Sequence, residues 1–152
     1  MSGRSRLRAW VLGRLPSSAF LLRRVVKEET PMTEMPKLPH HKLIAFGVAR
    51  DLLLAVRAAQ VRDAKLRDEA LRSAKSACLN CAEGAGRVSL PDKARAFTIA
   101  RGEACEAAAA VEVAALCGDA SPEDAQRVAQ LAHALVAMLT ALIRRGVSRA
   151  SA

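Results

Sequence analysis

Aromatic residues are scarce in this chain. Its 152 residues include no tyrosine, one tryptophan and three phenylalanines, whereas hydrophobic residues as a whole make up 51%. The apolar volume therefore comes from alanine, leucine and valine, a composition that favours helices over strands. So few aromatics argue against recognition of single-stranded nucleic acid by base stacking, and any RNA contact should be to backbone and shape. The length suits one domain with one core.

Long hydrophobic runs are missing as well. The most apolar stretches, 107–117 and 133–143, are shorter than the roughly 18 residues that a membrane helix needs, so we expect no membrane span. Arg14 and Pro16 interrupt the apolar run at 9–15, which excludes a secretory signal. Without export, the four cysteines are expected to be reduced thiols in a cytoplasmic protein rather than a disulfide framework.

Motifs for catalysis or cofactor binding are also few. A di-iron bundle needs Glu-x-x-His on two helices, but Gln130 stands three residues before His133. The spacing of Cys78 and Cys81 suits a metal or redox site that Cys105 and His133 could complete, so a thiol or zinc site stays open as an alternative to core thiols. We expect no enzyme, no cofactor and no metal.

Acidic residues are outnumbered, with 15 against 24 lysines and arginines and a net charge of +9. Residues 1–41 carry eight basic and three acidic residues, and residues 42–152 carry sixteen and twelve. We expect 1–41 to be a disordered basic extension, joined to the rest through a proline-rich connector of Pro31, Pro36 and Pro39. A transit peptide, or a true translation start at Met32 or Met35, remains an alternative.

Apolar residues at helical spacing begin near residue 42 and predict four helices at about 42–62, 63–84, 91–117 and 122–145. In the third helix the predicted buried stripe is Phe97, Ala100, Ala104, Ala107, Val111 and Ala114. Four helices with short corners predict an all-α, up-and-down antiparallel four-helix bundle over 42–145, followed by a disordered tail at 146–152.

Capping residues and glycines set the predicted helix ends. Asp63 and Ser89 are candidate N-caps, and Ser121-Pro122 begins the last helix. Gly84 and Gly86 are expected to end the second helix in backbone conformations closed to other residues. Gly118 should end the third helix, and Arg144 and Arg145 should close the fourth before Gly146.

A longer motif follows the second predicted helix. The segment Asn80-Cys81-Ala82-Glu83-Gly84-Ala85-Gly86-Arg87, together with Phe97-Thr98-Ile99-Ala100-Arg101-Gly102 and Glu106, resembles the pattern of the four-helix-bundle proteins encoded by intervening sequences in bacterial 23S ribosomal RNA genes. The resemblance covers about 42–145. Cys81, Glu103 and Cys78 depart from the family pattern, where isoleucine, serine and often proline stand.

The resemblance implies a small cytosolic homo-oligomer, typically a pentamer. Related bundle proteins are accessory subunits of reverse transcriptases in diversity-generating retroelements, where a basic surface engages RNA. The third helix independently favours self-association, because more of its circumference is apolar than one neighbouring helix can cover. We therefore expect a ring-shaped homo-oligomer.

Within the motif, Asn80, Glu83 and Glu106 are polar residues in apolar surroundings. A structural role, in which they satisfy backbone groups or bond across helices, is favoured over an acid-base pair. Gly84, Gly86, Phe97 and Gly102 complete the expected structural motif.

Basic residues are the best candidates for function. Arg62, Lys65, Arg72 and Lys75 recur at spacings of 3, 7 and 3 and share one side of the second helix if that helix is continuous. A second group, Arg87, Lys93 and Arg95, clusters at the following corner. Both groups could bind phosphates, although ordinary solvated faces would account for them somewhat better. The leading hypothesis is a noncatalytic bundle that binds structured RNA or a ribonucleoprotein; the alternatives are a protein-interaction adaptor, for example to a reverse transcriptase, and the thiol or metal site.

Overall fold

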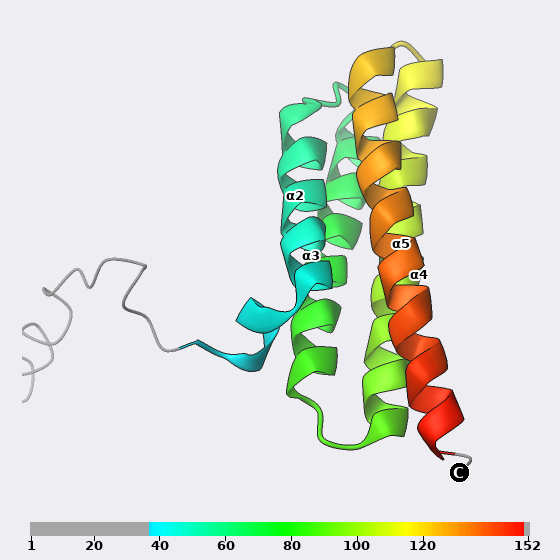
Figure 1. The fold of residues 1–152 in the computed structure, drawn as a ribbon. Coiled ribbons are helices and arrows are strands. Elements are labelled where there is room, and N and C mark those ends of the chain that lie inside the picture. The colour runs from blue at the N-terminus through cyan, green and yellow to red at the C-terminus, as the bar shows by residue number, and fades with distance from the viewer. Residues whose placement is uncertain (1–36, 151–152) are drawn as a thin grey trace, which may run out of the picture. The chain divides into compact units, whose positions relative to one another are not determined.

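Four long helices make up most of the structure, a computed structural model that describes residues 37–150 (Figure 1). After a short 3-10 helix, η2 (Pro39–Lys42), come α2 (Ile44–Ala58), α3 (Ala64–Gly86), α4 (Leu90–Leu116) and α5 (Pro122–Ala150). The predicted extension falls almost wholly outside the described residues, as do Met32, Met35, Pro31 and Pro36. The described part of the chain is all helical, as predicted.

The helices run alternately up and down. Each packs on its neighbour in sequence, and α5 closes the bundle against α2, so α2 and α4 lie on one diagonal and α3 and α5 on the other (Figure 1). The predicted stripe of α4 lies in the core, where Phe97 is 5% exposed and Ala100, Ala104, Ala107, Val111 and Ala114 are fully buried. Alanines at this interface let the helices approach closely, which explains how a core with so few aromatics can be filled.

The first predicted helix is too long at its C-terminal end. It ends at Ala58, and Gln60 takes a positive φ of 44° in the turn before α3. Val61, only 2% exposed, anchors this turn in the core, so the chain reverses without glycine or proline. At its start, Pro39 begins a 3-10 turn where a non-helical connector was expected.

The predicted caps of the next two helices are confirmed. The Asp63 side chain accepts a hydrogen bond from the Leu66 amide, and that of Ser89 accepts one from the Asp92 amide. Such caps satisfy backbone donors that a helix start leaves unpaired. Gly118, at φ 80°, ends α4 as predicted.

The explanation predicted for Gly84 and Gly86 is wrong. Both lie inside the last turns of α3, and within the described residues Gly118 is the glycine with a positive φ. At Gly84 the reason is steric, because a Cβ there would lie 2.6 Å from Cδ1 and 2.9 Å from Cζ of Phe97. Gly86 has no neighbour within 4 Å of such a Cβ.

The last helix is longer than predicted, because α5 continues through Gly146 to Ala150. Glycine weakens a helix by about 1 kcal/mol without forbidding it, and no proline follows. The stretch Pro122–Arg145 is long and apolar enough by composition to cross a membrane, with a mean hydropathy of 1.3. A bundle helix passes the same test when its core side is apolar, and Val128, Leu135 and Leu139 are fully buried in this bundle.

Candidate nucleic-acid interface

The predicted basic row on the second helix is not one continuous surface. Arg62 lies in the turn before α3, where its guanidinium donates to the Gly118 carbonyl and lies 3.6 Å from Asp119. Lys65, Arg72 and Lys75 are exposed on α3 itself. Arg62 thus ties this turn to the end of α4, and the row on the helix begins at Lys65.

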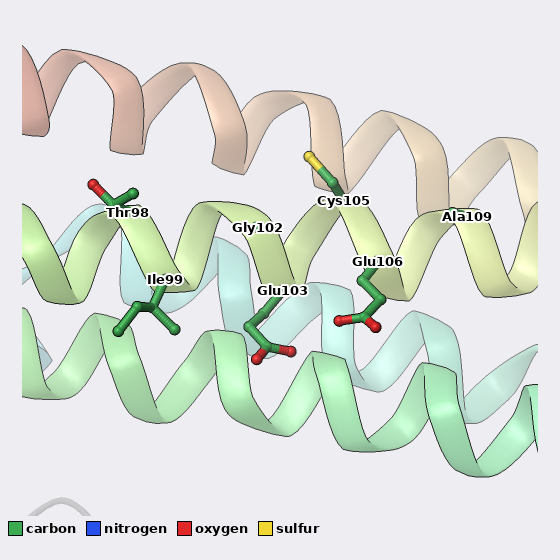
Figure 2. Close-up of a pocket in the computed structure, with 7 residues that line it drawn as sticks. All are labelled: Thr98, Ile99, Gly102, Glu103, Cys105, Glu106 and Ala109. Atoms are coloured by element: carbon green, nitrogen blue, oxygen red, sulfur yellow. The ribbon is translucent and has the colours of Figure 1, made fainter.

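Arg72 is surrounded by three carboxylates. Its guanidinium lies 2.5 Å from Glu69 one turn earlier, and 3.2 Å and 3.9 Å from Glu106 and Glu103 of α4. In Figure 2 both α4 carboxylates point toward α3. The hydrogen bond from Arg72 holds the pKa of Glu69 below its usual range. These four side chains, the Arg72 cluster, carry more negative than positive charge, which weighs against Arg72 as a phosphate ligand.

The second predicted group lies where α3 turns into α4. Arg87 caps α3 and reaches back to Glu83, at 2.5 Å between Nη2 and Oε1. This contact with Glu83 raises the already high pKa of Arg87. Since both side chains are about half exposed, the pair stabilises the corner only weakly. Lys93 and Arg95 follow within the first two turns of α4 and form no ion pair with any described residue.

Arg144 and Arg145, near the end of α5, are two further cations at the same end of the bundle. Arg101 of α4 donates from Nε to Thr140 Oγ1 of α5 at 3.0 Å, so these two residues lie at the same level of the antiparallel pair. Arg144 and Arg145, four and five residues beyond Thr140, therefore lie within about one turn, roughly 5.4 Å along the axis, of Arg95. Figure 1 places the end of α5 near the α3–α4 corner. The sequence pattern predicts these two arginines only as a helix end.

We call this end of the bundle the basic end. It comprises the cations Arg87, Lys93, Arg95, Arg144 and Arg145 and the acids Glu83 and Asp92. The opposite end, where α3 and α5 begin, has the reverse balance, with seven acids against five cations. The acids are Asp63, Asp68, Glu69, Glu112, Asp119, Glu123 and Asp124, and the cations are Arg57, Arg62, Lys65, Arg67 and Arg127.

The polar residues of the motif take part in local contacts. The Asn80 amide donates to the Ser76 carbonyl at 2.9 Å and to the Ser76 hydroxyl at 3.2 Å, within α3. Glu106 accepts from Arg72 across the α3–α4 interface. Together with the Glu83–Arg87 pair, these contacts are what a structural role would require.

The four cysteines do not form a single cluster. Cys81 is fully buried and Cys78 half-buried on α3, while Cys105 and Cys117 are exposed on α4. Burial raises the pKa of the Cys78 thiol, and raises that of Cys81 to about 12, so neither favours the thiolate that binds zinc or attacks disulfides. Among residues 37–150, no three His, Cys, Asp or Glu side chains are grouped to hold a metal ion.

The outward surface of α4 is apolar and shallowly hollowed. Figure 2 shows this hollow, which is lined by Thr98, Ile99, Gly102, Glu103, Cys105, Glu106 and Ala109. Ile99 and Val113 are 43% and 45% exposed, and Leu116 is 88% exposed. Gly102 lies in the middle of α4, and a Cβ at this position would have no neighbour within 4 Å, so nothing inside the described chain requires a glycine there.

Residues 43–141 match the family described as 23S rRNA-intervening sequence protein, a span that takes in α2, α3, α4 and most of α5. A search of curated proteins found no match.

Proposed function

Because the chain belongs to the 23S rRNA-intervening sequence protein family, we propose that it is a noncatalytic helical bundle that binds structured RNA through a basic surface. One observation carries the proposal: Lys93 and Arg95 are charged side chains with no ion-pair partner among the described residues. A cation near a helix N-terminus is disfavoured by the helix dipole. For Lys93, at the end of the first turn, this interaction is slightly unfavourable, and Arg95 lies beyond that turn, so the helix dipole stabilises neither charge and no described carboxylate offsets them.

The kind of RNA contact follows from the exposed side chains. Within the described chain the aromatic side chains besides histidine are Phe46, which is half-buried, and Phe97, which is buried. Among residues 37–150, bases therefore find no exposed phenylalanine, tyrosine or tryptophan to stack on, which favours a folded RNA whose phosphates present a fixed geometry.

The test is salt-dependent binding of the full chain. A labelled RNA hairpin of about 20 base pairs and a single-stranded oligonucleotide of the same composition are titrated with protein between about 0.05 and 0.2 M salt. We expect the hairpin to bind more tightly and its affinity to fall linearly on a log-log plot, because each phosphate contact releases condensed counterions. Absence of salt-dependent binding to the hairpin would overturn the proposal, and the adaptor role, for example to a reverse transcriptase, would replace it.

We also propose that the chain assembles into a ring of identical subunits, a pentamer in the simplest case. The exposed apolar surface of α4 supports self-association, since Ile99 and Val113 are almost half exposed and Leu116 is almost fully exposed in the described bundle. Gly102 would let a second chain approach the α4 backbone closely. In light scattering at micromolar concentration we expect an oligomer for the wild type and smaller species for Gly102→Leu. A monomeric wild type would contradict this assembly.

A further inference from the structure

We infer that the RNA phosphates bind at the basic end, on a surface to which three helix ends contribute, and that Arg144 and Arg145 of α5 form this site with Lys93 and Arg95, while Arg87 at the end of α3 is already paired with Glu83. The inference rests on the proposed function and deepens it, because it assigns the ligand to one end of the bundle. It also adds two residues from a segment about 50 positions away in the chain.

Two contacts show how these helix ends lie relative to one another. On one side, Phe97 packs against Gly84 so closely that no Cβ fits between them, which aligns the last turn of α3 with the start of α4. On the other side, the Arg101–Thr140 hydrogen bond aligns the start of α4 with the last turns of α5. The cations are therefore held on packed helices. Along the bundle axis they are spaced within one or two helix turns, or roughly 5–11 Å. Neighbouring phosphates along one RNA strand are separated by a similar distance.

Most of the cations at this end are not neutralised by a carboxylate and can therefore attract a phosphate. Arg95, Arg144 and Arg145 are exposed, Lys93 is half-buried, and none of the four is paired with a carboxylate in the described part of the chain. Of the two acids nearby, Glu83 is held by Arg87. Asp92 accepts the hydroxyl of the N-cap residue Ser89. A polyanion approaching this end meets a net positive field.

The other cationic surfaces are poorer candidates. The Arg72 cluster is net negative, and Arg62 is held by Asp119 and the Gly118 carbonyl. The end of the bundle that contains Arg62 carries more acids than bases, so a phosphate backbone is repelled there. The charge asymmetry along the axis therefore orients the RNA toward the end with Arg144 and Arg145.

The experiment compares charge-matched double variants of the full chain on the same RNA hairpin. Lys93→Gln with Arg95→Gln removes two cations from the α4 side of the site, and Arg144→Gln with Arg145→Gln removes two from α5. The matched control, Lys65→Gln with Arg127→Gln, removes two exposed cations, neither ion-paired with a described residue, from the opposite end. Glutamine keeps helix propensity, and circular dichroism with light scattering verifies that fold and assembly are unchanged.

Each basic-end variant should lose about tenfold in affinity near 0.1 M salt, and its log-log salt slope should be shallower by about one for each phosphate that the variant no longer neutralises. The control should bind within about twofold of the wild type. If the wild type binds but the Arg144/Arg145 variant matches the control, the assignment of α5 to the site is overturned while RNA binding stands. Equal losses in all three variants would mean nonspecific attraction to net charge and would overturn the site as a whole. A wild type that shows no salt-dependent binding would overturn the proposed function itself.

Discussion

Replacement of Gly84 by alanine tests the closest packing contact in the bundle. The added methyl carbon would lie 2.6 Å from Cδ1 and 2.9 Å from Cζ of Phe97, well inside van der Waals contact. Phe97 is only 5% exposed, so its ring has little room to swing away. Relief requires α3 and α4 to separate or the ring to leave its rotamer.

The expected magnitude is the difference between two opposing effects. Overpacking of a buried site costs about 1–3 kcal/mol. Against this, alanine is favoured over glycine inside a helix by about 1 kcal/mol. The net loss should be up to about 2 kcal/mol, which lowers the midpoint of thermal unfolding by up to roughly 8 °C for a domain of this size. Gly86→Ala is the matched control two residues later, where nothing lies within 4 Å of the new carbon, and it should leave stability unchanged or raise it slightly.

The assay is thermal and urea unfolding followed by circular dichroism, at one protein concentration because self-association shifts apparent stability. A double-mutant cycle with Phe97→Leu isolates the contact: with the ring removed, Gly84→Ala should cost nothing or stabilise, since only the helix-propensity gain remains. The predicted clash is refuted if Gly84→Ala is as stable as Gly86→Ala in the native background, or if its cost is the same with leucine at 97.

Two further predictions concern the extension and the buried thiol. Deleting residues 1–34 should shift the thermal midpoint by less than about 5 °C, because α2–α5 close the core by themselves; a larger drop would show that the segment packs on the bundle. Burial raises the pKa of Cys81 to about 12 in the folded chain, whereas a value of about 8.5 is expected in the unfolded chain. Between these two values the unfolded chain loses the thiol proton more readily than the folded chain. The stability that this thiol contributes is therefore present below about pH 8.5 and is lost as the pH rises toward 12. The fall in thermal midpoint between about pH 8 and about pH 11 should therefore be smaller for Cys81→Ala than for the wild type, and equal falls would contradict the assignment.

The bundle could be predicted because helical periodicity reports burial directly. Every position of the predicted α4 stripe is in the core, since a residue's side of a helix depends only on its spacing from its neighbours. Helix ends were harder to place. The chain leaves α2 through a positive φ at Gln60, a position without a conformational signal in the sequence, and it passes through Gly146 where a stop was expected.

The role of Gly84 shows a second limit. Its place near the end of α3 favoured the local interpretation that glycine supplies an unusual backbone conformation. The actual cause is non-local: the residue faces a phenylalanine thirteen positions later, across the helix corner. Only the register between α3 and α4 shows that one glycine of the motif is sterically required and that Gly86, its neighbour two positions on, is not.

The candidate site illustrates the same limit for charge. The row from Arg62 to Lys75 is the longer run of cations in the sequence, but Arg72 meets Glu103 and Glu106 more than 30 positions away, and Arg62 meets Asp119. The cations at the basic end come from three separate segments, and no sequence spacing relates Arg145 to Arg95. What a polyanion meets is the set of cations that the fold leaves unpaired, because a guanidinium already held by carboxylates gains little by exchanging them for a phosphate. The salt slope of RNA binding counts the phosphates neutralised. For each subunit in contact it should therefore lie closer to the few cations of the basic end than to the seventeen lysines and arginines of residues 37–150.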